Sequence, residues 1–221
     1  QWAQYSIAGP NARKVLQALV DPQFDIGNEA FPYMAAGHVT ICGGVPARLY
    51  RISFSGELAY EIGVGARYGD SLARVLMQAG ASYNIAPYGT EALSVMRIEK
   101  GHVAGNEMDG RTTARDLGLG RMMSTKKDYI GRVLAGRPAL TEPDRVRIVG
   151  IKPLDPTKRL RAGAHLLPTD ATTDADHDQG VVTSVAFSPS LGHWIGLGLL
   201  QRGPERFGER VRAVDLVRDA D

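Results

Sequence analysis

The sequence of 221 residues is poor in cysteine, in long apolar runs and in excess charge of either sign. Its one cysteine, Cys42, excludes an internal disulfide framework and a cysteine-based zinc cluster, and we expect it to be buried as a small apolar side chain. The longest apolar stretch, residues 194–200, is far shorter than the roughly 20 residues of a membrane-spanning helix. Together these features predict a water-soluble, cytoplasmic protein without a membrane partner.

The charges argue against nucleic acid as a partner. The 26 basic residues are scattered among 24 acidic residues rather than gathered into a basic face. The sequence also has no phosphate-binding loop, nucleophile elbow, HExxH zinc pair or GxGxxG fingerprint after a strand, and Gly118-Leu119-Gly120 is typical of a turn. We therefore expect neither a metal site nor dinucleotide chemistry in this chain.

Apolar periodicity predicts an α+β organisation for the first part of the chain. Strands are expected over residues 2–7, 38–42, 46–54 and 58–62, with a hairpin turn at Gly43-Gly44. Helices are expected over residues 10–20, over 68–79 with Gly80 as the C-terminal cap, and over 87–100, where Gly101 stops the helix.

The second part of the chain has a different character. Residues 101–125 are glycine-rich and lack periodicity, and a short helix is expected over 129–135. Five short alternating runs, over residues 146–151, 164–167, 180–187, 194–199 and 210–217, then predict a small β-barrel or sandwich. We expect Trp194 to be structural and one face of the strand at 194–199 to be core. We therefore expect two domains, an α+β domain over residues 1–141 and an all-β domain over residues 142–221.

Three polar clusters are candidates for chemistry, and the first contains Glu57 and Glu61. If the strand is regular from Gly56 onward, both carboxylates lie on one face. A carboxylate that faces a pocket can accept two parallel hydrogen bonds from an amidine-like N–H pair, the edge displayed by a pterin or guanine ring. The residues by themselves favour the plainer interpretation of one surface glutamate and one salt-bridged glutamate.

The other two clusters have structural interpretations of similar weight. Residues 97–102 end the third predicted helix, where Lys100 and His102 complement the helix dipole. Residues 105–113 place polar side chains between glycines, which fits either the wall of a binding site or an ordered loop.

Taken in order, these clusters resemble the folate-binding aminomethyltransferase family, which includes the glycine cleavage T-protein. Residues 54–62 (Phe-Ser-Gly-Glu-Leu-Ala-Tyr-Glu-Ile) are similar to its Tyr-Thr-Gly-Glu-x-Gly-Tyr-Glu-Ile signature. Residues 96–101 are similar to its helix end, 105–113 to its Gly-Asn-Asp-x-Asp loop, and 182–192 to its barrel motif. The resemblance implies the T-protein folate-binding fold, without its N-terminal part, followed by a small C-terminal β-barrel domain.

Within that family, three sequence segments are similar to those of sarcosine oxidase alpha subunits of the heterotetrameric type: residues 98–107, 116–132 and 190–198. The resemblance implies the tetrahydrofolate-binding portion of an oxidoreductase that demethylates sarcosine to glycine and captures the one-carbon unit as 5,10-methylenetetrahydrofolate. It implies tetrahydrofolate as the cofactor of this region, NAD and the flavins FAD and FMN elsewhere in the intact enzyme, and beta, gamma and delta subunits as partners. The isolated chain is expected to be inactive as an oxidase.

The resemblance also implies site residues. The pterin-recognising glutamate of the family corresponds to Glu61, its stacking aromatic to Phe54, and a position lining the folate site to His102. The position of one T-protein arginine is occupied here by Leu93. The sequence does not show which residue replaces that arginine. The catalytic aspartate of the family is expected upstream of residue 1.

Three other functions remain open at this stage. The same chemistry fits a dimethylglycine dehydrogenase or a glycine-cleavage T-protein, although the departure at Leu93 argues against the latter. A folate-binding or assembly domain without turnover is the third possibility.

Overall fold

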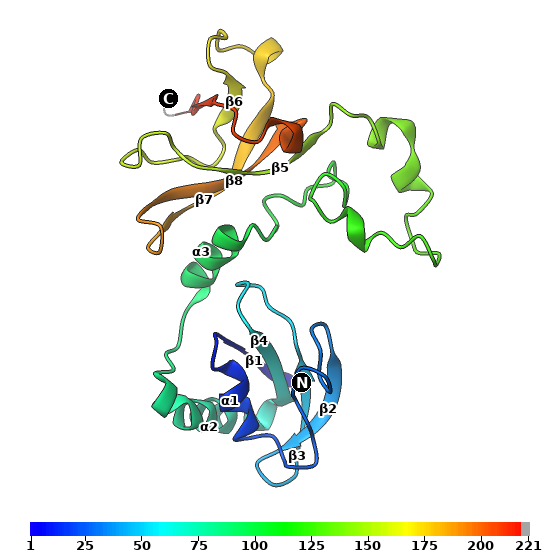
Figure 1. The fold of residues 1–221 in the computed structure, drawn as a ribbon, viewed down its shortest axis with the longest axis vertical. Helices are drawn as coiled ribbons and strands as arrows, with labels where there is room; N and C mark the ends of the chain where they lie inside the picture. The colour runs from blue at the N-terminus through cyan, green and yellow to red at the C-terminus, as the bar shows by residue number, and fades with distance from the viewer. Residues whose placement is uncertain (218–221) are drawn as a thin grey trace. The chain divides into compact units, whose positions relative to one another are not determined.

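The computed structural model describes residues 1–217 and divides the chain into two compact units, which we describe separately (Figure 1). The N-terminal unit is Gln1–Leu93, and the C-terminal unit begins at Ser94. The division reflects which segments pack together, and its boundary lies within the helix α3 (Thr90–Lys100). The domain boundary between residues 141 and 142 rests on a change of sequence character and stays a prediction.

The N-terminal unit is a four-stranded antiparallel sheet with two helices packed on one face. Its strands are β1 (Trp2–Ala8), β2 (Ala36–Ile41), β3 (Val45–Tyr50) and β4 (Ala59–Gly65), in the order β1-β4-β3-β2. The helices are α1 (Ala12–Gln17) and α2 (Gly69–Gly80). Leu16 of α1 and Leu72 of α2 join Ile62 and Val64 of β4 in the core, so one face of the sheet is covered by helices.

The glycine hairpin between β2 and β3 forms as predicted. Gly43 and Gly44 have φ angles of 79° and 116°, which glycine adopts without strain. Cys42 precedes them in the same turn and is exposed, so the expected burial of its side chain is wrong. Cys42 lies in the turn after the end of β2, so its side chain is not on the face of that strand that packs into the core.

The end of α2 differs from the prediction. Gly80 is the last helical residue rather than the cap, because the chain continues into a 3₁₀ turn and only Asn84 takes the left-handed conformation, with φ 56°. A Cβ on Gly80 would lie 2.6 Å from the Ile85 side chain, so this glycine permits close packing instead.

The C-terminal unit contains a five-stranded antiparallel sheet in the order β5-β8-β7-β6-β9. The strands are β5 (Val146–Ile151), β6 (His165–Pro168), β7 (Gly180–Ser188), β8 (His193–Gln201) and β9 (Val211–Val214), which confirms all five predicted runs. Val95 and Ile98 of α3 pack on Ala186 and Ile195 of β7 and β8. No helix within residues 1–217 is long and apolar enough to cross a membrane.

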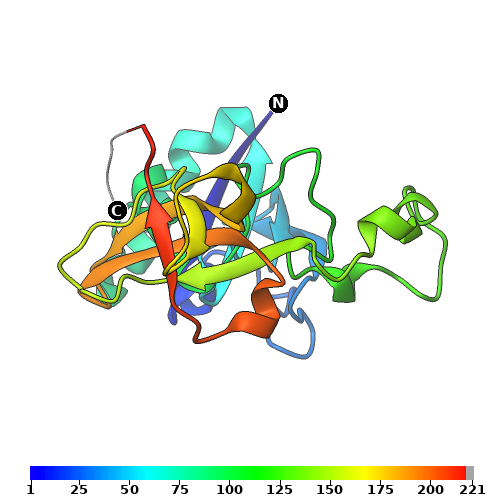
Figure 2. The ribbon, with the colours of Figure 1, turned by 90° about the horizontal axis from the view of Figure 1, so that it is seen from above.

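Single 3₁₀ turns complete the described structure: η1 (Ala66–Tyr68), η2 (Ala81–Tyr83), η3 (Gly120–Met122), η4 (Leu134–Gly136), η5 (Pro138–Leu140), η6 (Ala175–His177) and η7 (Gly203–Arg206). The predicted helix over 129–135 is wrong. Gly131, at φ 91°, interrupts it, and the side chains of Ile130 and Val133 are exposed, so no packing favours a helix there. Both views show the segment between η3 and β5 extending away from the five-stranded sheet (Figures 1 and 2).

Strand β8 is buried on both faces, rather than on the single face expected from its alternation. Ile195 and Leu197 are buried on one face, and Gly196 and Gly198 alternate with them in the sequence. Trp194, at the start of the strand, packs edge-to-face with Phe187 at 6.1 Å, and the Arg159 guanidinium lies 4.7 Å from its ring centroid. The structural role predicted for Trp194 agrees with these contacts.

We expect Gly198→Ala to lower the free energy of unfolding of the C-terminal unit by roughly 1–3 kcal/mol. A Cβ there would lie 2.6 Å from Ile151 Cδ1 and 2.9 Å from the Val181 carbonyl oxygen, and the latter is backbone that moves only with its strand. Urea unfolding followed by tryptophan fluorescence measures the effect. Gly150→Ala on the edge strand β5 is the control, because its Cβ meets nothing within 4 Å, and equal losses would contradict the packing argument.

Candidate functional site

Glu61 lies on β4, between β1 and β3 in the N-terminal sheet. Its neighbours Tyr60 and Ile62 are fully buried. Strand alternation directs the Glu61 side chain to the face opposite Ile62, where it is half-buried. Ser6 and Tyr50 lie opposite it on the adjacent strands. Glu61 is therefore a carboxylate on the face of the sheet that the two helices leave uncovered.

Gln4 holds one oxygen of this carboxylate. Its side-chain amide donates a hydrogen bond to Glu61 Oε2. Gln4 pairs with Gly63, two residues from Glu61, so Gln4 and Glu61 are diagonal neighbours on one face of the sheet. Within residues 1–217, Glu61 Oε1 accepts no hydrogen bond. The sequence pattern did not single out Gln4, and its only signal is the outward position that alternation gives it along β1.

Glu57 does not share the position of Glu61. The strand begins at Ala59, and the turn before it contains Gly56 at φ 94°, whose amide donates to Ser53 Oγ at 2.8 Å. The condition of a strand that is regular from Gly56 onward is therefore not met. Glu57 is an exposed turn residue, and only Glu61 lies on the sheet.

Phe54 lies in this same turn, with 43% of its surface exposed. The turn connects directly to β4, so Phe54 and Glu61 belong to one continuous segment of the N-terminal unit. The ring is therefore partly accessible for stacking on a ligand.

His102 belongs to the C-terminal unit and follows α3. Its amide donates to the Arg97 carbonyl at 2.8 Å, and the Gly101 amide donates to Ile98 at 3.0 Å. With Gly101 at φ 78°, this is the Schellman arrangement that ends a helix at a glycine. The backbone of His102 is thus fixed by the helix end, and its side chain is half-buried.

A buried polar cluster lies inside the C-terminal unit. Arg97 and Glu107 are 5% and 0% exposed and form an ion pair, with 3.0 Å between Nη1 and Oε2. Glu107 Oε1 accepts hydrogen bonds from the Thr183 and Ser184 hydroxyls at 2.7 and 2.5 Å, and Oε2 accepts one from the Ala104 amide at 2.7 Å. Each carboxylate oxygen therefore has at least two donors.

A β-bulge in β7 makes this coordination possible. The pairing of β7 with β8 shifts register between Val182 and Ser184, so Thr183 and Ser184 both reach Glu107 although they are consecutive. A second contact joins α3 to β7, since the Ser188 hydroxyl donates a hydrogen bond to Glu99 Oε1 at 2.6 Å. The helix end, the loop at 105–109 and the barrel motif are thus joined by structural contacts.

Burial acts to raise the pKa of Glu107. The hydrogen bonds from Ser184, Thr183 and Ala104, together with the Arg97 charge, nevertheless hold its pKa below the ordinary value. Burial likewise acts to raise the pKa of Asp116, but hydrogen bonds from Arg145 and Thr113, together with the Arg145 charge, hold its pKa below the ordinary value. Both carboxylates are therefore ionised and act as fixed acceptors. Within residues 1–217, no group of three histidine, cysteine, aspartate or glutamate side chains could hold a metal ion.

Two family models match this chain. The GCVT N-terminal domain covers residues 1–127, and the glycine cleavage T-protein C-terminal barrel domain covers residues 147–216. The chain therefore belongs to the glycine cleavage T-protein family. The aminomethyltransferase T of the glycine cleavage system from Bartonella henselae has this fold, with a TM-score of 0.75 at 25% identity, over 97% of this chain and 56% of that one. The predicted α+β T-protein fold with a C-terminal barrel domain is confirmed.

A more specific similarity lies within the family. The sarcosine oxidase subunit alpha of Rhizobium meliloti (strain 1021) is 50% identical over 213 residues, which are 96% of this chain and 21% of that protein. The aminomethyltransferase of Streptomyces avermitilis is 28% identical over 219 residues, 97% of this chain and 56% of that protein. The chain thus spans about a fifth of the first relative and about half of the second. The predicted similarity to the T-protein-like portion of a larger oxidoreductase subunit is confirmed.

Proposed function

We propose that this chain is the tetrahydrofolate-binding portion of a sarcosine oxidase alpha subunit. The observation that carries the proposal is the position of Glu61, a half-buried carboxylate on the uncovered face of the N-terminal sheet, with Oε2 held by Gln4. The 50% identity to a sarcosine oxidase subunit alpha favours this host over an aminomethyltransferase at 28%.

The residues present fit the pterin part of tetrahydrofolate. A pterin edge offers adjacent N–H donors, and Glu61 offers an acceptor, Oε1, that accepts no hydrogen bond within residues 1–217. Gln4 restricts rotation of the carboxylate, which lowers the entropy lost when a ligand is bound. Phe54 provides a partly exposed ring for stacking. His102 stays a proposed folate-binding residue on the family resemblance alone.

Bound tetrahydrofolate would supply the nucleophilic nitrogen that takes up the one-carbon unit. The contribution of this chain is to hold and orient the pterin, since orientation can lower a barrier by several kcal/mol. No residue of the chain is assigned as the acid or base. In the proposed whole protein, NAD, FAD and FMN bind outside this region, the partners are the beta, gamma and delta subunits, and the location is the cytoplasm.

The direct test is anaerobic calorimetry of tetrahydrofolate binding to the full-length protein, with a parallel assay for 5,10-methylenetetrahydrofolate. Binding together with sarcosine-dependent product formation is the expected result. Binding without product would indicate a folate-binding domain without turnover, and a preference for dimethylglycine would favour the dehydrogenase-type host. Absence of folate binding would overturn the proposal.

Phe54→Ala should weaken tetrahydrofolate binding by roughly two- to tenfold, because a stacking contact contributes ~0.5–1.5 kcal/mol. Phe54→Tyr should bind nearly as well as the unchanged protein, since it keeps the ring. Tyr33→Ala is the control, because Tyr33 is an aromatic side chain of the same unit that is 66% exposed. The same calorimetric titration measures all three variants, and a loss in Tyr33→Ala equal to that in Phe54→Ala would remove Phe54 from the site.

A further inference from the structure

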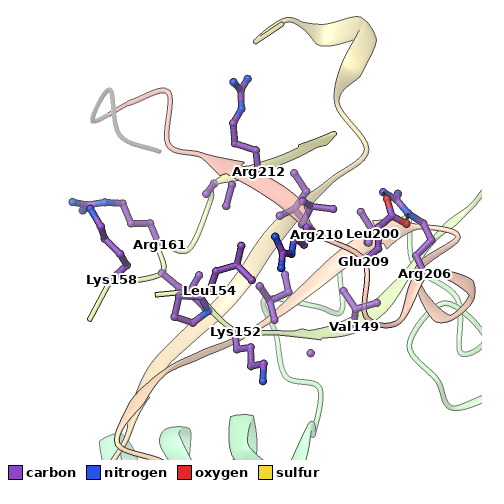
Figure 3. Close-up of a pocket in the computed structure, with 18 of the residues that line it drawn as sticks. Val149, Lys152, Leu154, Lys158, Arg161, Leu200, Arg206, Glu209, Arg210 and Arg212 are labelled. Carbon is purple, nitrogen blue, oxygen red and sulfur yellow. Dashed lines mark hydrogen bonds and ion pairs between the residues drawn. The ribbon is translucent and has the colours of Figure 1, made fainter. Parts of the chain in front are cut away.

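A cavity of about 570 Å³ opens in the five-stranded sheet of the C-terminal unit (Figure 3). It is lined by β5 over residues 149–151, by the following loop over 152–161 and by the chain from Arg206 to Asp215. Its volume falls within the range of about 300–1,000 Å³ that is typical of small-molecule sites. None of the residues assigned to tetrahydrofolate lines it.

The cavity exists because the sheet is open along one side. In the order β5-β8-β7-β6-β9, the strands β5 and β9 each have a hydrogen-bonded neighbour on one side only. Both of these edge strands line the cavity. An opening between them therefore gives access to the interior of the barrel domain.

The floor of the cavity is apolar. Val149, Ala164, Leu166 and Leu200 line it and belong to one buried core cluster. Above this floor, the lining side chains of Leu154 and Phe207 are each 74% exposed, so an apolar ligand surface can cover them, and such burial is favourable by roughly 25 cal/mol per Å². The cavity thus suits a hydrocarbon or aromatic body.

The rim of the cavity is basic. Seven lysine or arginine residues line it against three aspartate or glutamate residues. Several of these cations have partners: Arg206 pairs with Glu209 at 2.6 Å, Arg161 lies 3.9 Å from Asp215, and Arg212 donates to the Ala171 carbonyl at 3.0 Å. The excess positive charge selects for an anion.

Among the arginines that line the cavity, Arg210 is the most available to a ligand. Within residues 1–217 its guanidinium has no hydrogen bond or ion pair, and the same holds for the Lys152 ammonium. Figure 3 shows Arg210 near the middle of the drawn side chains, with Lys152 at their lower edge and Arg212 extending away from them. A guanidinium binds a carboxylate with two parallel hydrogen bonds, which gives both orientation and affinity.

We propose that this cavity binds an organic carboxylate with an apolar body, of the class of a medium-chain fatty acid. Arg210 binds the carboxylate, Lys152 adds positive charge, and the apolar body lies against the exposed side chains of Leu154 and Phe207. The site goes beyond the proposed folate function and does not depend on it.

The test is calorimetry of the full-length protein with octanoate, octanol and sulfate as probes. Octanoate should bind at least about tenfold more tightly than either octanol, which lacks the charge, or sulfate, which lacks the apolar body. Arg210→Gln should weaken octanoate binding by about tenfold or more, and Arg210→Lys by less. Arg132→Gln, which removes an exposed cation outside the cavity, and Glu61→Gln, which removes the folate contact, should leave octanoate binding unchanged.

Each other result has a definite meaning. Equal binding of sulfate and octanoate would overturn the apolar part of the proposal, and equal binding of octanol would overturn the role of Arg210. Unchanged affinity in Arg210→Gln would overturn the site itself. Because Glu61→Gln affects only the folate site, failure of one proposal is distinguishable from failure of the other.

Discussion

Glu61→Gln is expected to weaken tetrahydrofolate binding to the full-length protein by roughly ten- to a hundredfold. A charge-assisted hydrogen bond contributes ~1.5–3 kcal/mol, and 1.4 kcal/mol corresponds to a factor of ten in affinity. Glutamine also replaces one acceptor by an N–H group that faces the N–H donors of the pterin edge. Anaerobic calorimetry measures the loss.

Glu57→Gln is the matched control. It makes the same chemical change four residues earlier, in an exposed turn instead of on the sheet, and should leave affinity nearly unchanged. Gln4→Leu should give an intermediate loss, because Glu61 keeps its charge but loses the hydrogen bond that holds Oε2. Equal effects at Glu57 and Glu61, or full affinity in Glu61→Gln, would remove Glu61 from the pterin site.

Glu107→Ala should lower the free energy of unfolding of the C-terminal unit by roughly 3–5 kcal/mol. The substitution leaves the buried Arg97 guanidinium without its counter-charge and removes the acceptor of the Thr183 and Ser184 hydroxyls. Urea unfolding measures the change. Asp109→Ala is the control, because Asp109 pairs with Arg111, whose side chain is 91% exposed, and little stability should be lost there.

The stabilisation by Glu107 should also depend on pH. Its pKa is lowered in the folded chain, so its stabilising effect is complete above the unfolded value of about 4.3 and is lost as the pH falls through the folded value. The difference in stability between the unchanged protein and Glu107→Gln should therefore be constant near pH 7 and shrink below about pH 4. A difference that stays constant down to pH 3 would show that the ionised carboxylate does not stabilise the fold.

Local sequence signals determined most of the secondary structure. The Gly43-Gly44 turn, the stop at Gly101 and the alternation over residues 146–151 each depend on the conformation of one or a few residues. The predicted helix over 129–135 was wrong because its apolar residues have no core to pack on, which no local pattern reveals. The exposure of Cys42 likewise follows from its place in a turn and not from its residue type.

The candidate site likewise depends partly on local sequence and partly on tertiary structure. The sequence identified Glu61 through a motif, but it left open whether Glu57 shares its strand face, and the start of β4 at Ala59 decided this. Gln4 lies 57 residues from Glu61, and their contact depends on the pairing of β1 with β4. The contact between Gln4 and Glu61 could be seen only from the register of the sheet.

The sequence by itself determined the family, the order of the strands and of the helices α1 to α3, and the motifs that contain Glu61, Arg97 and Glu107, because these depend on residues that are close together in the chain. The tertiary structure decided what these side chains contact. Glu107 meets Thr183 and Ser184 across 76 and 77 residues, and the cavity forms between two sheet edges that no local pattern connects. Long-range strand pairing and burial bring these groups together, and neither is encoded in the period or composition of a single segment.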